Sequence, residues 1–239
     1  MGTVNIKGDI VDNSTASFYE FFGMDAVSPS GVSQQLADGD DDEIEVNIAS
    51  NGGDLFAASE IYTMLKDDPR NVTVNIQGLA ASSASIIAMA GDVVNIAPTA
   101  QMMIHQVWSN VQGNADDMRS SAESLDSADQ AVVNAYALKT GLGSESILAM
   151  MQQETWMNAQ EAVDKGFADK IMFVDEKQPQ LINATHTIPS HEAINKFLTM
   201  MAKSSMDKPK PAETKADSKP TLREQKLAFL FGKETSNED

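Results

Sequence analysis

Three short segments of this chain carry residue types that could together transfer an acyl group to a serine. Ser82 follows a predicted strand and a run of small residues, at the start of a predicted helix, where free N–H groups and the positive end of the helix dipole gather. His105 ends the apolar segment MMIHQ, and an imidazole can take a proton from a serine hydroxyl near neutral pH. Gly52 and Gly53 end a third segment and allow backbone N–H groups to face a developing oxyanion.

Each of these segments also has an ordinary structural interpretation, and the residues alone leave both open. Ser82 could be a plain helix N-cap, a position where serine is common. The glycine pair could be an anion-binding turn, although the lysine of a phosphate-binding loop does not follow it. His105 could be a partly buried structural side chain. The other two histidines, His186 and His191, stand in a polar stretch that is typical of a surface.

Composition excludes several classes of protein. With 239 residues, 42% of them hydrophobic and 22% charged, the chain is long and apolar enough for a globular fold with a substantial core. The absence of cysteine excludes disulfides, thiolate zinc sites, iron–sulfur clusters and a cysteine nucleophile. A net charge of -18 repels phosphate backbones, so nucleic acid is not an expected partner.

No metal, other cofactor or membrane contact is expected either. The acidic run DGDDDE at residues 38–43 lacks the glycine position and distal glutamate of an EF-hand, so we interpret it as a solvated loop. The sequence has no apolar run long enough to span a membrane, and its first residues lack the pattern of a signal peptide. A cytoplasmic location is therefore expected.

The elements that must position the three segments follow from hydrophobic periodicity. Strand-like and helix-like stretches alternate, which predicts an α/β fold with a largely parallel sheet. The strand-like stretches are VNIKG, EIEVNIAS, NVTVNIQG, DVVNIAP and MMIHQ. A helix is predicted over residues 54–66, directly after the Gly-Gly turn, and a long helix with one apolar stripe over 114–139. Helices this long often pack on neighbouring subunits.

The composition changes after about Ala202, where lysine, proline, serine and acidic residues leave almost nothing to bury. This pattern predicts a flexible linker over 203–220. Residues 221–239 then read as a short amphipathic helix and tail, with Thr221 as the N-cap and an apolar face that includes Phe231. Docking on its own domain and binding a partner both remain open for this helix.

Five motifs in a fixed order, spanning about residues 3 to 175, give the chain a family resemblance. They are S-x-G-G, G-x-A-A-S, M-I-H-Q, A-L-x-T-G and A-x-E-A-V-x-x-G. In this order they resemble the proteolytic subunit of the Clp protease, and within that family the virus- and prophage-encoded relatives proposed to act in head maturation. The resemblance implies a crotonase-like fold of ββα-type repeats with a long handle helix, in a peptidase domain that we place over residues 1–185. A C-terminal helix is expected over 186–202, beyond the region of resemblance.

The same resemblance implies an activity and a set of site residues. The family cuts unfolded polypeptides inside heptameric rings, singly or doubly stacked, with a Ser-His-Asp triad. Carried over by motif, Ser82 is the nucleophile and His105 the general base, and the N–H groups of Gly52 or Gly53 and of Ser83 form the oxyanion hole. No cofactor is implied.

Three departures from the family pattern bear on this expectation. Alignment on the E-A-V motif places Glu154 where the family has its catalytic aspartate, and a glutamate can serve if the backbone retreats slightly. Val107 replaces a proline, which predicts a less rigidly held His105. Met1 lies just before the first strand, leaving little room for a propeptide or for the axial N-terminal loops used near an unfoldase.

The leading hypothesis is therefore a ring-forming serine endopeptidase that cleaves scaffold or head proteins during virus assembly. The first alternative is the proteolytic subunit of an ATP-dependent Clp protease that works with an AAA+ unfoldase. A catalytically decayed scaffolding shell protein and a crotonase-type enzyme acting on acyl-CoA are further alternatives; the paired AAS and MIHQ motifs speak against the last.

Overall fold

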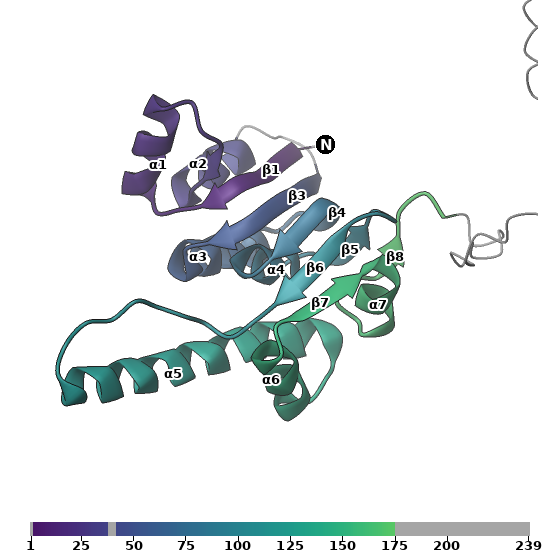
Figure 1. Ribbon diagram of the computed structural model, residues 1–239. Helices are drawn as coiled ribbons and strands as arrows, with labels where there is room; N and C mark the ends of the chain where they lie inside the picture. Colours follow the sequence, from purple (N-terminus) through teal and green to yellow (C-terminus); the bar gives the residue numbers. More distant parts are fainter. Residues whose placement is uncertain (1, 38–41, 175–239) are drawn as a thin grey trace, which may run out of the picture. The chain divides into compact units, whose positions relative to one another are not determined.

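A computed structural model of the chain describes residues 2–37 and 42–174 (Figure 1). The predictions for the segments after residue 185, and for most of the acidic run at 38–43, lie outside the described residues. Within the described ranges no helix is both long and apolar enough to cross a membrane.

The centre of the fold is an eight-stranded sheet whose main path runs in the order β2-β1-β3-β4-β5-β8, with every pair on this path parallel. Off this path, β6 pairs in parallel with the end of β4 and antiparallel with β7. The strands are β1 Gly2–Ile10, β2 Ala26–Val27, β3 Glu43–Gly53, β4 Asn71–Ala81, β5 Val93–Ile96, β6 Gln101–Ile104, β7 Thr155–Asn158 and β8 Lys170–Ile171. The helices are α1 Asn13–Phe21, α2 Pro29–Ala37, α3 Leu55–Asp67, α4 Ser83–Ala88, α5 Ala115–Thr140, α6 Ser144–Gln152 and α7 Ala159–Asp164.

A repeated tripeptide explains why four of these strands form one layer. Val-Asn-Ile occurs in β1, β3, β4 and β5, and successive residues of a strand face opposite sides of the sheet. The valines and isoleucines are buried in one core with apolar residues of α2, α3 and α4, and each such side chain stabilises the fold by about 1.5–3 kcal/mol. On the other face Asn47, Asn75 and Asn95 stand in register, and Asn95 donates a hydrogen bond to Asn75 at 2.8 Å.

Parallel pairing brings the three chemical segments to one edge of the sheet. Strands β3, β4 and β6 run in the same direction, so their carboxyl ends lie near one another. Gly52 and Gly53 end β3, Ser82 directly follows β4, and His105 directly follows β6. Ligand sites in open α/β sheets form at this edge because loops and helix starts converge there.

The long helix α5 begins at an end that projects away from the sheet, and its C-terminal half lies against this edge (Figure 1). Asn114 caps its first turn in a capping box with Asp117, and Gly141 ends it in a left-handed conformation with φ 72°. Four residues of the helix are buried: Asp129, Val132, Val133 and Tyr136. The α/β fold with a parallel sheet and a long helix confirms the sequence prediction. The packing of α5 on another subunit stays a prediction.

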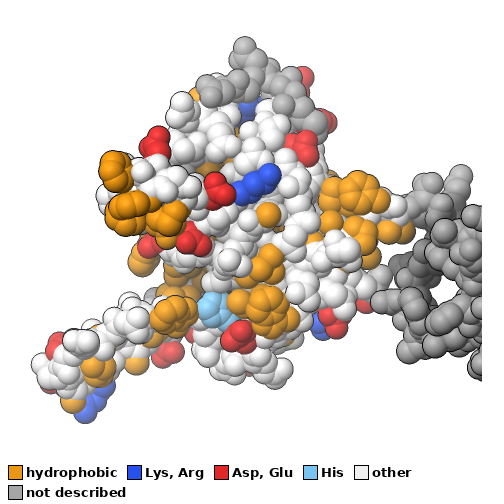
Figure 2. Space-filling model, turned by 45° about the horizontal axis from the view of Figure 1, so that its top comes forward, with side chains coloured by type: hydrophobic (Ala, Val, Ile, Leu, Met, Phe, Trp, Pro, Cys, Tyr) orange, Lys and Arg blue, Asp and Glu red, His pale blue; other side chains and the backbone are white. Residues whose placement is uncertain are grey.

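Several large hydrophobic side chains face outward. Helix α1 has no buried residue, and Phe18, Phe21 and the C-cap residue Phe22 are each more than half exposed, with the Phe22 ring in contact with the other two (Figure 2). Phe56 on α3 and Leu138 on α5 are each 81% exposed. Contiguous apolar surface of this kind is typical of a face that another chain covers.

Candidate active site

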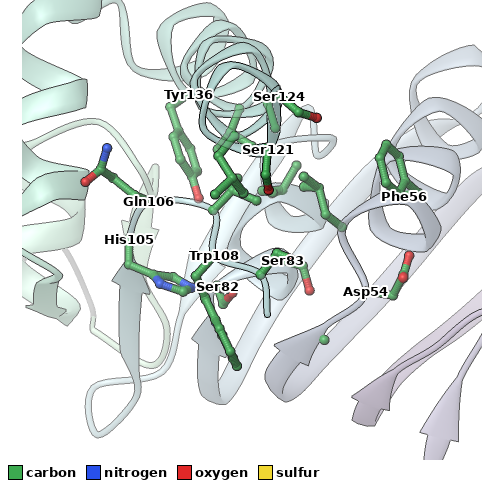
Figure 3. Close-up of a pocket in the computed structure, with 18 residues that line it drawn as sticks. Asp54, Phe56, Ser82, Ser83, His105, Gln106, Trp108, Ser121, Ser124 and Tyr136 are labelled. Atoms are coloured by element: carbon green, nitrogen blue, oxygen red, sulfur yellow. Dashed lines mark hydrogen bonds between the residues drawn. The ribbon is translucent and has the colours of Figure 1, made fainter. Parts of the chain in front are cut away.

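The structure brings Ser82 and His105 together. The Ser82 Oγ lies 2.7 Å from the His105 Nε2, a hydrogen-bond distance, and both side chains are partly buried. Ser82 is the N-cap residue of α4, but its side chain makes no capping hydrogen bond. The hydroxyl that could have capped the helix is directed to the imidazole instead, as Figure 3 shows. This pairing is the arrangement in which a histidine can remove a serine proton.

The backbone of Ser82 is strained, and both its N–H and its carbonyl group make hydrogen bonds. Its φ of 53° and ψ of -128° are rare for a residue with a side chain, and such conformations cost about 1–3 kcal/mol. The Ser82 N–H donates to the Met103 carbonyl of β6 at 2.9 Å. The Ser82 carbonyl accepts two hydrogen bonds from Ser85, one from its N–H at 2.9 Å and one from its Oγ at 2.6 Å. These bonds keep the hydroxyl raised above the turn between β4 and α4.

The glycine pair lies directly beside the serine. A Cβ at Gly52, where φ is +98°, would come within 2.7 Å of the Ala81 carbonyl oxygen and 2.8 Å of the Ser82 Cβ. The Gly52 N–H already donates to the Ser50 Oγ at 3.1 Å. Gly53 and Ser83 line the cleft, and the Ser83 N–H begins α4 and therefore has no intrahelical acceptor. Of the three N–H groups proposed from sequence, those of Gly53 and Ser83 are therefore the better placed for an oxyanion.

Glu154 lies near His105 in the backbone, but its side chain does not join the pair. Antiparallel pairing sets Ile104 opposite Thr155, and His105 and Glu154 are the residues that adjoin this pair on the two strands. The Glu154 side chain is exposed and accepts a long hydrogen bond of 3.4 Å from the Trp156 Nε1. In the described part of the chain it makes no hydrogen bond to His105. The residue stands at φ 49°, a conformation that few glutamates adopt.

A cleft of about 360 Å³ opens beside the Ser82–His105 pair (Figure 3). Its walls come from α3, α4, α5 and the loop after His105, and contain no lysine or arginine. The large apolar side chains on the walls are Leu55, Phe56, Ile86, Val107, Trp108, Leu125 and Val132. In Figure 2 the pale-blue histidine reaches the surface with hydrophobic side chains around it. Such walls suit an extended polypeptide with apolar side chains better than an anionic ligand.

The segment after His105 is anchored by a residue that sequence reasoning missed. Asp129 of α5 is 5% exposed, and its carboxylate accepts one hydrogen bond from the Gln106 Nε2 and one from the Val107 N–H, both at 2.7 Å. A proline at position 107 would have no N–H to donate. The Val107 N–H therefore makes a hydrogen bond that a proline could not make, and the looser hold on His105 stays a prediction.

Ser85 and Tyr136 are two further residues that the sequence did not single out. Tyr136 of α5 is fully buried, its hydroxyl lies 2.7 Å from the Ser85 Oγ, and its ring packs edge-on against Phe167. Burial raises the pKa of the Tyr136 phenol well above its usual value, with the Ser85 hydrogen bond opposing part of that shift. The spacing of Tyr136 in the sequence matches the apolar stripe of its helix. No sequence signal therefore marked its hydroxyl as a hydrogen-bonding partner near the site.

Comparison with known proteins places this geometry in a family. The sequence model of the Clp protease family matches residues 32–175, which include every residue of the candidate site. The chain belongs to the Clp protease family. This membership makes it a serine peptidase, and it agrees with the fold and with the Ser82–His105 pair.

Individual Clp protease relatives match over most of the same region. The chain is 27% identical over 176 residues to the ATP-dependent Clp protease proteolytic subunit of Bacteroides fragilis, covering 72% of this chain and 80% of that protein. It is 29% identical over 132 residues to the ATP-dependent Clp protease proteolytic subunit of Deinococcus radiodurans, covering 54% of this chain and 65% of that protein. Helix α1, which carries the exposed phenylalanines, lies before the region that the Clp protease model matches.

Proposed function

We propose that this chain is the proteolytic subunit of a Clp-type endopeptidase and cleaves unfolded polypeptides, with Ser82 as the nucleophile and His105 as the general base. The observation that carries the proposal is the 2.7 Å contact between the Ser82 Oγ and the His105 Nε2, inside the region shared with the family. The cleft beside this contact, lined by large apolar side chains together with several serines, has room for an extended peptide.

The proposed reaction follows from the positions of these groups. The Ser82 Oγ attacks the scissile carbonyl while the His105 Nε2 takes its proton, and the N–H groups of Gly53 and Ser83 stabilise the oxyanion. His105 returns the proton to the leaving amine, which leaves an acyl-enzyme on Ser82. A water molecule, deprotonated by His105, then hydrolyses the acyl-enzyme. No metal or cofactor enters these steps.

Glu154 is proposed as the orienting acid of this reaction. When Nε2 accepts the serine proton, Nδ1 carries the other ring proton, and within the described residues that nitrogen has no hydrogen-bond partner. His105 and Glu154 directly adjoin the paired residues Ile104 and Thr155, and the Glu154 side chain is exposed, so the proposal is that this side chain rotates to bring its carboxylate to Nδ1. A carboxylate there stabilises the imidazolium that forms during attack.

Replacing Glu154 with alanine is expected to slow acylation of Ser82 by about 10- to 100-fold. This is the loss in rate expected when the transition state loses one charge-assisted hydrogen bond. Intact-mass spectrometry of the protein reacting with a fluorophosphonate probe measures this rate. Glu123→Ala, which removes an exposed carboxylate from α5, is the matched control and should react like the wild type. Equal rates for Glu154→Ala and the wild type would exclude Glu154 as the acid.

The partners are also part of the proposal. The exposed apolar residues on α1, α3 and α5 support assembly into a homo-oligomeric ring, for which the family resemblance suggests seven subunits, in the cytoplasm. Both relatives are named as subunits of ATP-dependent proteases, which favours work with an AAA+ unfoldase over the role in virus assembly suggested by the sequence. Cleavage of scaffold or head proteins has no support from these comparisons.

The test of the proposed function needs no known substrate. The wild type is treated with the fluorophosphonate probe, and peptide mass mapping is expected to find one adduct, on Ser82. Degradation of casein is then followed with and without ATP and a Clp unfoldase of the host cell, and degradation that requires ATP supports the ATP-dependent role. An assembled ring that forms no adduct would favour the scaffolding alternative. Adduct formation with selective cleavage of head proteins would restore the virus-assembly hypothesis.

A further inference from the structure

Two polar side chains lie on the otherwise apolar buried face of α5. Asp129 and Tyr136 are seven residues apart, which is about two helical turns, so they share the face that also buries Val132 and Val133. Each begins a short chain of hydrogen bonds, and the two chains lead to different members of the Ser82–His105 pair.

The first chain runs from Tyr136 to the nucleophile, and its direction follows from the protons available. The Ser82 carbonyl can only accept, so the single hydroxyl proton of Ser85 goes to that carbonyl, at 2.6 Å. The Ser85 Oγ must then accept from the Tyr136 hydroxyl, at 2.7 Å. Tyr136 therefore fixes the Ser85 hydroxyl, which in turn fixes the carbonyl of a residue in a strained conformation.

The second chain runs from Asp129 to the base. Its carboxylate accepts from the Val107 N–H and from the Gln106 side chain, the two residues that directly follow His105. Both bonds are charge-assisted and lie mostly away from solvent, so they are stronger than bonds between neutral groups. They hold the backbone at the point where the chain leaves β6.

We infer that the buried face of α5 sets the position of both the nucleophile and the base, through Tyr136 and Ser85 on one side and Asp129 on the other. The inference rests on the proposed function of Ser82 and His105. Asp129, Ser85 and Tyr136 are positioning residues, since none of them lies in hydrogen-bond contact with the reacting atoms.

The test uses two nearly isosteric variants of the full chain. Tyr136→Phe removes one hydroxyl, and Asp129→Asn turns one acceptor oxygen into a donor. We expect the maximal rate of fluorophosphonate labelling to fall about three- to tenfold in Tyr136→Phe and about tenfold in Asp129→Asn. The probe concentration for half-maximal rate should stay unchanged, because Tyr136→Phe keeps the ring that lines the cleft and Asp129 is not among the lining residues. The double variant should show the product of the two effects, since the chains end on different residues.

Val133→Ala is the matched control, because it weakens packing on the same face of α5 without removing a hydrogen bond. It should lower the thermal midpoint yet label at close to the wild-type maximal rate. If Tyr136→Phe fails to fold, Ser85→Ala removes the same chain from its other end. Folded Tyr136→Phe and Asp129→Asn proteins that label at the wild-type rate would overturn the inference, as would an equal loss in Val133→Ala.

A second readout separates the inference from the proposed function. The chain has three histidines, so ¹³C labelling of the imidazole rings gives three Cε1–H signals, and the His105 signal is assigned by its loss in His105→Gln. We expect this signal to move in Tyr136→Phe and Asp129→Asn but not in Val133→Ala. A wild type that never labels would refute the proposed function, whereas an unmoved His105 signal in both variants would refute the inference.

Discussion

Replacing Ser82 with alanine is expected to abolish peptide cleavage, with a fall in rate of about 10⁴- to 10⁶-fold. The reason is that the Ser82 Oγ is the hydroxyl that lies within hydrogen-bond distance of the His105 Nε2. Without this hydroxyl the protein keeps its oxyanion site and its cleft but has no nucleophile. An oxyanion site and a binding cleft alone give only weak residual catalysis. Cleavage of a fluorogenic peptide and loss of the fluorophosphonate adduct measure the effect in parallel.

The companion variants make this result specific. His105→Gln is expected to be nearly as inactive, and the double variant no slower than Ser82→Ala alone, because nucleophile and base act as one unit. Ser127→Ala removes an exposed hydroxyl from α5 outside the cleft and should cleave at the wild-type rate. Wild-type cleavage by a folded Ser82→Ala protein would place the chemistry on another residue and end the proposed mechanism.

Gly52→Ala is expected to reduce cleavage by about 100-fold or more while the protein still folds. The added methyl group would lie 2.7 Å from the Ala81 carbonyl oxygen, 2.8 Å from the Ser82 Cβ and 3.0 Å from the Ser83 nitrogen. It must therefore push the nucleophile and the first N–H of α4 away from their positions. The φ of +98° adds backbone strain for any residue with a side chain.

Gly78→Ala provides the matched control for this steric effect. Gly78 lies on β4, the strand that pairs with the β3 strand of Gly52, but a Cβ at Gly78 meets no atom within 4 Å. This variant should cleave at the wild-type rate, and circular dichroism and thermal unfolding of both variants distinguish local displacement from loss of fold. A Gly52→Ala protein that unfolds like the wild type and retains full cleavage would show that the backbone beside Ser82 does not shape the transition state.

Local sequence patterns account for the layers of the fold. The Val-Asn-Ile tripeptide has the period of a strand, and residues 54–66 and 114–139 have the period of a helix, so each pattern carries its own secondary structure. The observed helices, Leu55–Asp67 and Ala115–Thr140, begin one residue later because Asp54 and Asn114 are their caps. These features depend on neighbours in sequence, which is why they can be predicted.

The candidate site was only partly predictable for the same reason. Ser82, His105 and the glycine pair lie at strand ends in recognisable motifs, and parallel pairing then brings them together. Glu154 was placed by alignment on its motif, but alignment cannot set a rotamer, and its exposed side chain bonds Trp156 instead.

The sequence by itself determined the α/β architecture, the serine and histidine available for acyl transfer, and the family. It could do so because periodicity and motif order are properties of consecutive residues. Only the tertiary structure decided that Asp129 accepts a hydrogen bond from the Val107 N–H and that Tyr136 is linked to the Ser82 carbonyl through Ser85. These partners are separated by 22 and 51 residues along the chain. A buried polar side chain in a helix has the same local pattern whether or not it has a partner, so only the packing of α5 against the sheet edge reveals what it holds.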